Sequence, residues 1–309
     1  MQTLALNLRS LTFVAVLALA STGCIKKMLL DGQIESTLKA SAAVQTFSDW
    51  EVAQRAASAG MSTAEGMHFL APYNENALLL LTKGWSGLSF GFIEDEMEQA
   101  QDEHGEDSEQ AEYHKARAVA AYVRAIYYGT KVLDMRNEGF DAAKKNVSTM
   151  RAWLKGFEDA EDAPYLLWTG QAWISRVNLL KDQPEVVADL FIAHQMIKRS
   201  VELDPKYNYA TGHTILGAYH ARSATAELDE SKKHFDAALK INGGKALLTK
   251  LNLAAKYYCV KVDKANYVKL LTEVVEAGDV LPEQRLSNTI AKRRARRYLS
   301  KERMANCGF

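Results

Sequence analysis

Histidine is the residue of this sequence whose spacing first suggests metal chemistry, because two of the seven histidines share one predicted helix. His213 and His220 stand seven residues apart, which places them on one helix face but two turns from each other. Chelation by a helix uses residues on adjacent turns, as in the His-Glu-x-x-His motif. We therefore interpret both as packed or surface histidines, and we predict neither a metal site nor a cofactor.

Composition and motifs also argue against catalysis. The sequence lacks a phosphate-binding loop, paired zinc-type cysteines and a His-Glu-x-x-His motif. Its 38 basic and 38 acidic side chains balance, so no net charge attracts nucleic acid or acidic lipid. These observations disfavour an enzyme and favour a binding or scaffolding protein.

An acidic run between residues 93 and 112 is the other candidate for chemistry, since carboxylates are the ligands that Ca²⁺ prefers. Its spacing differs from an EF-hand loop, which needs acidic or amide residues at alternate positions, a central glycine and a final glutamate. We interpret the run as a solvated helix end and an exposed loop, with a metal site as the alternative. Its acidic residues are Glu94, Asp95, Glu96, Glu98, Asp102, Glu103, Glu106, Asp107, Glu109 and Glu112.

The N-terminal residues have the pattern of an export signal. Arg9 precedes an apolar run over residues 11–20 that is too short to span a bilayer, and Gly23-Cys24 follows. This ending resembles the bacterial lipobox, although Ser21 stands where lipoboxes usually have leucine. We predict a signal peptide over residues 1–23, lipidation of Cys24 and a lipidated tether over residues 24–33. Cleavage without lipidation is the alternative.

Lipidation would determine the location of the protein, because two or more acyl chains hold a protein stably on a membrane. Ile25 follows the cysteine in place of the aspartate that resembles an inner-membrane retention signal. In a Gram-negative cell we therefore expect the periplasmic leaflet of the outer membrane. In that oxidising compartment Cys259 and Cys307 can pair, and a buried free thiol is the alternative.

A joint between two predicted helices at residues 201–220 indicates the fold class. Asp204-Pro205 ends the first helix, because proline lacks an N–H and disfavours helical geometry before it. Leu216-Gly217 and His220 occupy positions where a tetratricopeptide repeat has Leu-Gly and an aromatic residue. A shift of 38 residues aligns this joint with a second one, in which Tyr257 matches Tyr219. Trp168 to Trp173 form part of a third, looser repeat.

The predicted fold is therefore all-α, an array of antiparallel helix pairs built from degenerate tetratricopeptide-like repeats. A helical bundle with chance similarity is the alternative. Residues 34–309 are predicted to form a single domain. We expect a lead-in helix that ends at Gly60 and a new helix from Ser62, because Ser-Thr-Ala-Glu resembles a helix start.

The segment from residue 77 to 92 is apolar almost all the way round, which predicts a helix buried on several sides. Gly84, Gly87 and Gly91 recur on one face, where a neighbouring helix or a ligand can approach the backbone. Helical glycine costs about 1 kcal/mol relative to alanine, so we expect such a close approach.

Pro282 opens a final, strongly basic helix. We interpret it as a polar cap on the helical array, with contact to a protein or to anionic lipid as the alternative; export excludes nucleic acid as a target. Its basic residues are Arg285, Lys292, Arg293, Arg294, Arg296, Arg297, Lys301 and Arg303.

Several of these features together resemble one known family. The lipobox-like N-terminus, the helical repeats and two segments, 72–81 and 84–92, are similar to the T component of TRAP-transporter-associated periplasmic systems, called TatT. The resemblance implies a periplasmic lipoprotein that oligomerises, with a trimer as the candidate state, and docks a DctP-type substrate-binding protein. It also implies help in delivering a small ligand, hydrophobic ligands included, to a TRAP permease.

Five aromatic residues would then line an apolar channel or a partner surface, if they face the concave side of the array. Ordinary core packing is the alternative for each of them. The main rival function is a tetratricopeptide-type scaffold lipoprotein of envelope assembly with no transported ligand, and a lipid-anchored enzyme is a second rival. The candidate residues are Trp85, Phe90, Phe92, Trp168 and Trp173.

Overall fold

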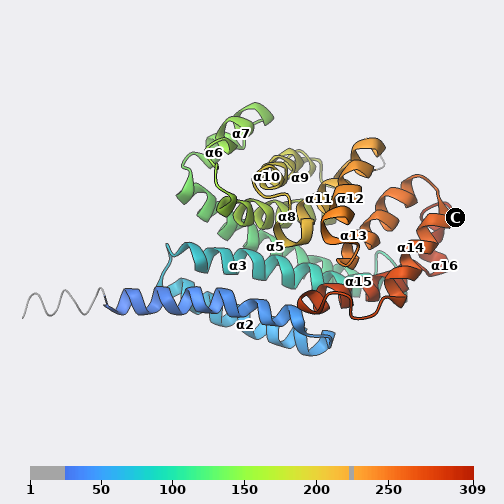
Figure 1. The fold of residues 1–309 in the computed structure, drawn as a ribbon, viewed down its shortest axis with the longest axis horizontal. Coiled ribbons are helices and arrows are strands. Elements are labelled where there is room, and N and C mark those ends of the chain that lie inside the picture. Colours follow the sequence, from blue (N-terminus) through green and yellow to red (C-terminus); the bar gives the residue numbers. More distant parts are fainter. Residues whose placement is uncertain (1–24, 223–225) are drawn as a thin grey trace, which may run out of the picture.

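The computed structural model describes residues 25–222 and 226–309, and this part of the chain is helical without any strand. The predicted signal peptide and Cys24 lie outside the described residues. A helix over residues 25–40 begins the described chain (Figure 1). The elements that follow are η1 (Ser41–Thr46), α2 (Trp50–Leu70), α3 (Glu75–Leu88), η2 (Ser89–Ile93), α4 (Glu94–His104), α5 (Glu109–Arg136), α6 (Phe140–Ala143), α7 (Val147–Leu154), η3 (Ala160–Asp162), α8 (Ala163–Leu179), α9 (Pro184–Val187), α10 (Leu190–Leu203), α11 (Tyr207–His220), α12 (Leu228–Asn242), α13 (Leu247–Asn252), η5 (Leu253–Tyr258), α14 (Lys264–Glu276), η6 (Pro282–Gln284), α15 (Arg285–Tyr298) and α16 (Lys301–Ala305).

Side-chain caps explain where several of these helices begin. Asp49, Asn74 and Ser108 each accept a hydrogen bond from a backbone N–H in the first turn of α2, α3 and α5. Such caps satisfy N–H groups that have no partner within the helix. The predicted break at Gly60 is wrong, because α2 continues through Gly60 and Ser62 to Leu70.

Consecutive long helices pack as neighbours, as the predicted array requires. Contacts join α2 to α3, α3 to α5, α5 to α8, α8 to α10, α10 to α11 and α11 to α12. In this array Gly170 of α8 faces Ile197 of α10, and Gly217 of α11 faces the ring of Phe235 in α12. An added methyl group on either glycine would lie less than 3 Å from those side chains. Gly170 and Gly217 therefore allow these helices to pack closely.

The 38-residue shift found in the sequence also relates the helices of the structure. Adding 38 to the bounds of α10 gives residues 228–241, and α12 is Leu228–Asn242. Adding 38 to those of α11 gives residues 245–258, which contain α13 and η5. The same shift carries the first residue of α13, Leu247, onto the first residue of α15, Arg285. The helix pairs therefore recur at a constant spacing, which is compatible with tetratricopeptide-like repeats.

The joint between α10 and α11 has the expected stop and an unexpected turn. Helix α10 ends at Leu203, and Asp204 follows in extended geometry. Asn208, Tyr209 and Ala210 then adopt positive φ angles of 47°, 58° and 62°, so a left-handed turn precedes the regular part of α11. Such backbone is costly for residues with a side chain. The amide of Asn242 steadies it by donating to the Tyr209 carbonyl.

A disulfide between Cys259 and Cys307 attaches the chain's last residues to the region between η5 and α14. The predicted alternative of a free thiol at Cys259 is therefore wrong. Tyr267 of α14 and Phe309 pack edge to face beside this bond. The bond therefore fixes the C-terminal segment on the last repeat.

The last long helix returns to the first elements of the chain. Helix α15 contacts η1 and α2 as well as its neighbours α13 and α14. Ser287 donates to the Gln45 side chain and Thr289 to the Ser48 carbonyl. The array is therefore closed on itself near the start of α2 (Figure 1). Within the described residues no helix combines the length and apolar character needed to cross a bilayer.

Candidate functional site

The predicted glycine-aromatic helix changes its winding at the point where its aromatic residues lie. It is α-helical over Glu75–Leu88 and π-helical over Ser89–Ile93. A π-turn shifts the backbone hydrogen bonds by one residue and leaves carbonyl groups open to other donors, and such turns are common at functional sites. Arg294 donates to the Phe90 carbonyl at 2.7 Å, and the Trp50 indole donates to the Gly91 carbonyl at 3.1 Å.

The same donors hold the aromatic rings of this turn. The Arg294 guanidinium lies 4.3 Å from the centroid of Phe90, and that of Arg293 lies 4.2 Å from Trp50. Trp50 in turn packs on Phe92, with ring centroids 5.3 Å apart. Cation–π contacts of this kind strengthen when they are desolvated. We call the place where η2, α4 and α15 meet the charged junction.

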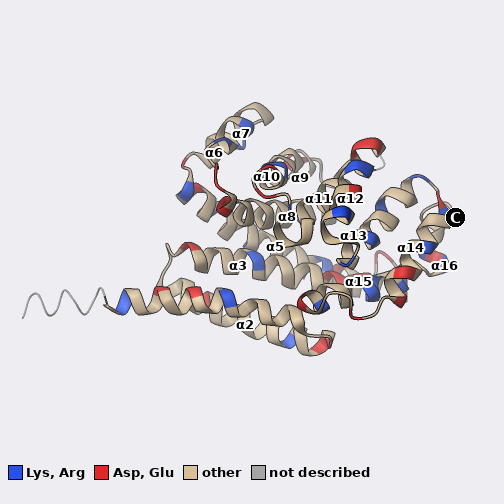
Figure 2. Cartoon of the chain, in the orientation of Figure 1, with Lys and Arg blue, Asp and Glu red and all other residues tan. Residues whose placement is uncertain are grey.

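Opposite charges from the two predicted charged stretches meet in the charged junction. Asp95 of α4 is fully buried and accepts hydrogen bonds from Arg293 at 2.9 Å and from Arg297 at 2.5 Å. Farther along α4, Arg297 also pairs with Glu98, and Arg303 pairs with Asp102. Basic and acidic residues accordingly lie side by side around α15 (Figure 2).

This arrangement corrects one prediction and extends another. The first part of the acidic run is not a solvated helix end, because Glu94, Asp95 and Glu98 are buried or nearly buried against α15. Its later part, around Glu106 and Asp107, is exposed as predicted. Helix α15 lies at the end of the array, as expected of a cap, and its arginines bind the chain's own carboxylates.

The interior of the charged junction holds two carboxylates whose pKa values are shifted in opposite directions. Burial raises the pKa of Glu94, and Arg294 offsets this only in part; Tyr122 donates a hydrogen bond to Glu94. Burial also acts to raise the pKa of Glu98, but Arg294 and Arg297 outweigh it, so the net pKa is lowered. Glu98 is therefore the firmly ionised partner of the two arginines, whereas Glu94 takes up a proton more readily.

The second π-helical segment, η5, contributes a lysine to the surroundings of the charged junction. Its Lys256 lies within the electrostatic range of Glu94, Glu98 and Arg294. Lys256 is exposed to solvent, yet protein surrounds it on several sides, and this desolvation lowers its pKa. The two π-segments therefore face one set of charges, although they are about 160 residues apart in the chain.

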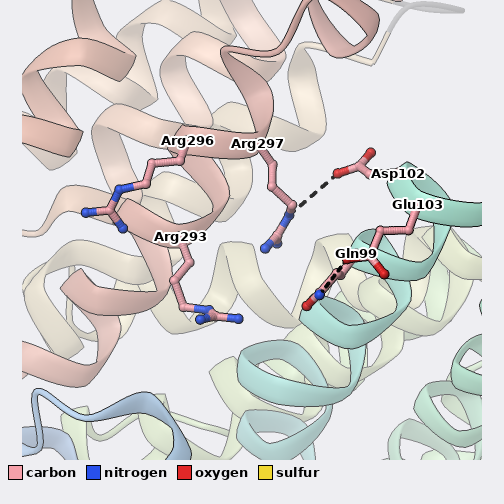
Figure 3. Close-up of a pocket in the computed structure, with 6 residues that line it drawn as sticks. All are labelled: Gln99, Asp102, Glu103, Arg293, Arg296 and Arg297. Carbon is pink, nitrogen blue, oxygen red and sulfur yellow. Dashed lines mark hydrogen bonds and ion pairs between the residues drawn. The ribbon is translucent and has the colours of Figure 1, made fainter.

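The charged junction opens to solvent through a recess of about 330 Å³ between α4 and α15. Figure 3 shows Arg293 and Arg297 directed toward α4, whereas Arg296 points away from it. Gln99, Asp102 and Glu103 form the opposite wall. The Gln99 amide donates to Glu103, Arg303 donates to Asp102, and Arg293 and Arg297 donate to Asp95, so most polar groups of the recess have partners within the chain. We interpret the recess as the outer edge of an intramolecular interface.

The five predicted aromatic residues occupy four different environments. Phe90 and Phe92 belong to the charged junction described above, and Phe92 is buried. Trp168 is buried in α8, donates to the Tyr207 hydroxyl and lies under the Lys83 ammonium. Trp173 is buried beside Phe140. Only Trp85 and Phe90 of the five keep partial exposure. The five residues therefore do not line one common surface.

Trp85 lies in a polar cluster near the surface that joins three helices. Glu65 of α2 accepts hydrogen bonds from the Trp85 indole, from Arg124 and from Tyr128 of α5. Burial acts to raise the pKa of Glu65, but these three donors outweigh it and the pKa is lowered. The Arg124 guanidinium lies 5.4 Å from the Trp85 ring. An aromatic ring, an arginine and a carboxylate are thus held in a fixed arrangement.

The two histidines singled out in the sequence belong to a larger group. His213 lies 2.9 Å from His234 of α12 through their Nδ1 atoms, and His220 stacks on His234. His194 of α10 stacks on Tyr219. Burial lowers the pKa of His194 and of His234 to about 4 each. Among the described residues no group of three or more His, Cys, Asp or Glu has the geometry of a metal site.

Sequence reasoning overlooked a nucleophile-like motif that the structure explains. Gly87-Leu88-Ser89-Phe90-Gly91 has the G-x-S-x-G spacing of hydrolases, in which the serine occupies an exposed turn between a strand and a helix. Here Ser89 is fully buried between two helices, and its hydroxyl donates to the Ala118 carbonyl. The motif therefore packs η2 against α5 and has no catalytic setting.

Sequence reasoning also missed the charged junction, although a signal for it exists. Asp95, Glu98 and Asp102 are spaced by three and four residues, and Arg293 and Arg297 are four residues apart. Each set forms one stripe on its helix, and the two stripes have opposite charge. Treating the two stretches as possible partners would have predicted their contact.

Comparison with known proteins places the chain in a family. Residues 46–305 match the family model described as TRAP transporter T-component (TAtT). No curated protein matches the chain. The match covers most of the 309 residues and confirms the resemblance found in the sequence.

Proposed function

Because the chain belongs to the TRAP transporter T-component family, we propose that it docks a DctP-type periplasmic substrate-binding protein and assists TRAP-type uptake of a small ligand, hydrophobic ligands included. The family role is that of a non-enzymatic accessory component of a transporter. The observation that carries the proposal is the extent of the match, which runs from η1 to α16 and so includes the whole closed array.

The docking surface that we propose is the exposed face of α5 next to Trp85. Val123 and Tyr127 lie one turn apart on this face with 47% and 58% of their surface exposed. Arg124 lies between them in sequence and over the Trp85 ring. Tryptophan, tyrosine and arginine dominate the binding energy of protein interfaces, particularly where their neighbours hold them in place. Glu65 provides that support here.

Alanine substitutions test this surface. In Trp85→Ala and Tyr127→Ala we expect the affinity for the substrate-binding protein to fall about 30-fold, the size of a typical hot spot. Isothermal titration calorimetry measures the affinity of each variant for the substrate-binding protein. The matched control is Trp153→Ala, which removes another half-buried tryptophan whose indole donates a hydrogen bond, here to the Asn137 carbonyl. Equal affinity losses in all three variants would contradict a specific surface.

The location and assembly of the protein are a further part of the proposal. We propose that Cys24 carries the lipid, that the protein faces the periplasm from the inner leaflet of the outer membrane, and that it forms a homo-oligomer, with a trimer as the candidate state. Replacing Cys24 with serine should abolish the incorporation of a labelled fatty acid into the protein. A protein that keeps its membrane anchor but binds no substrate-binding protein would instead be a scaffold lipoprotein of envelope assembly.

A further inference from the structure

Apolar side chains are exposed together at the end of the molecule where the described chain begins. At the end of α2 and in the turn to α3, Phe69, Leu70 and Tyr73 have 86%, 68% and 74% of their surface exposed. On the helix over residues 25–40, Met28 and Leu29 have 69% and 65% exposed. Large apolar side chains gathered on a surface mark a site of interaction.

Two contacts bring these side chains to one place. The Asn74 amide donates to the Asp31 carboxylate at 2.7 Å, which ties the first helix to the α2–α3 turn. Ile34 is fully buried against Met67 and Ala77, so the opposite face of that helix remains outside. Met28 lies within one helical turn of Asp31. Residue 25 and the α2–α3 turn accordingly share one end of the molecule, far from the C-terminus (Figure 1).

Basic residues accompany this apolar surface. Lys26 and Lys27 are exposed beside Ile25, and the Lys131 ammonium lies 5.0 Å from the centroid of the Tyr73 ring. The nearby acidic residues have partners, since Asp31 accepts from Asn74 and Glu75 pairs with Arg136. Apolar side chains with lysines at their edge suit the interface of a bilayer that contains anionic lipid.

The position of residue 25 favours a membrane as the partner of this apolar surface. Cys24 immediately precedes Ile25 in the sequence, so an anchor on Cys24 would be attached at this end of the described chain. Any acyl chain on Cys24 therefore starts beside the exposed side chains. A membrane that holds this anchor must approach the same end of the domain.

We propose that Met28, Leu29, Phe69, Leu70 and Tyr73 form a membrane-seating surface, which inserts into the lipid headgroup region while Lys26 and Lys27 bind anionic headgroups. The surface fixes the orientation of the array on the bilayer. A lipid anchor alone would leave the array free to tilt. Tyrosine suits this position, because its ring is apolar and its hydroxyl remains hydrated. This inference depends on one part of the proposed function, the lipid anchor at Cys24.

Vesicle flotation of the chain from Ile25 onward tests the surface without the anchor, because that chain retains every described contact. The test variant carries Phe69→Ser, Leu70→Ser and Tyr73→Ser. The matched control carries Tyr113→Ser, Val123→Ser and Tyr127→Ser, which replaces the same kinds of side chain, also exposed, on α5. Vesicles contain phosphatidylcholine alone or with phosphatidylglycerol, and circular dichroism melting verifies that each variant folds.

We expect the unaltered chain and the α5 variant to float with the anionic vesicles, and binding of the test variant to fall at least about tenfold. Lys26→Gln with Lys27→Gln should weaken binding to anionic vesicles and leave binding to neutral ones unchanged. Equal flotation of the two triple variants overturns the proposal, as does an unaltered chain that does not float. If sedimentation velocity shows that the test variant loses self-association instead, the surface joins two copies and the proposal is wrong.

Failure of the membrane-seating surface can be distinguished from failure of the proposed docking function. The α5 variant should lose the substrate-binding protein and keep the vesicles, and the test variant should do the reverse. A Cys24 that carries no lipid would alter neither flotation result.

Discussion

Glycines in similar helical positions of this protein differ in what surrounds them. Gly87 in α3 has open space where a methyl group would lie, whereas at Gly217 in α11 that group would be 2.9 Å from the buried ring of Phe235. We expect Gly87→Ala to raise the free energy of unfolding by about 0.5–1 kcal/mol through helix propensity. Gly217→Ala should lower it by about 1–3 kcal/mol, because the ring has no room to move.

Urea unfolding followed by circular dichroism measures both changes. The comparison also refines the prediction that all three glycines of the 77–92 segment face a close neighbour. Gly84 meets Met61 and Gly91 meets Ile290, but Gly87 does not. Changes of the same sign in Gly87→Ala and Gly217→Ala would contradict the role assigned to packing.

His194 makes the stability of the protein depend on pH. Burial, with His220, Lys198, Arg222 and Arg151 nearby, lowers its pKa from 6.5 to about 4. Below pH 6.5 the unfolded chain therefore binds a proton that the folded chain excludes, so the free energy of unfolding falls as the pH falls. Between pH 7 and pH 5 this residue alone should account for a loss on the order of 2 kcal/mol.

Urea unfolding at the two pH values measures that loss. His194→Asn should reduce the difference between pH 7 and pH 5, since asparagine does not titrate. The control is His104→Asn at an exposed position, which should retain the full difference. A difference unchanged in both variants would assign the acid sensitivity to other groups.

The contact between α4 and α15 depends on Asp95, which is fully buried between Arg293 and Arg297. Removing one partner of a buried ion pair leaves the other charge uncompensated, and this commonly costs about 3–5 kcal/mol. We expect a loss of this size in Asp95→Ala by chemical denaturation. Asp107→Ala, in the exposed loop after α4, should change the stability by less than about 0.5 kcal/mol. Similar small losses in both would mean that the ion pairs do not hold α15 in place.

Local signals in the sequence were sufficient for most helix boundaries and insufficient for what the helices contact. Asn74 and Ser108 cap α3 and α5, and Asp204-Pro205 ends α10, as their types predict. Gly60 failed as a stop signal because α2 packs on α3 along its length, and that packing outweighs a propensity cost of about 1 kcal/mol. The pairing of α4 with α15 spans about 200 residues, a separation on which local patterns carry no information.

For the candidate aromatic residues, too, the sequence predicted the helix but not its contacts. Helical spacing placed Trp168 and Trp173 on one helix, but whether their rings face a partner or the core depends on α10, α11 and the Phe140 segment. Residues 72–92 carried the family resemblance, which the match over residues 46–305 confirms. Docking and lipidation concern molecules that a single chain does not contain, so they need the experiments described above.

Closure of the array predicts how the whole molecule unfolds. In an open repeat array each repeat contacts only its neighbours, and distant repeats can unfold separately. Here α15 contacts η1, α2 and α4, so loss of the last helix removes support from the first ones. All five tryptophans lie within residues 50–173, which makes their fluorescence a reporter of this part of the chain. Circular dichroism reports the whole chain.

In Arg297→Ala we therefore expect the fluorescence and circular dichroism transitions to shift together to lower denaturant, by an amount that corresponds to about 2–4 kcal/mol. The matched control is Arg296→Ala, because Arg296 lies on the same helix and points away from α4 (Figure 3). It should leave both transitions in place. A fluorescence transition that stays fixed while the circular dichroism transition splits would show that the tryptophan-containing part and the rest of the chain unfold independently. Coincident transitions mean that the first helices and the last repeat share one folding equilibrium, so that destabilising the last repeat also destabilises the first helices.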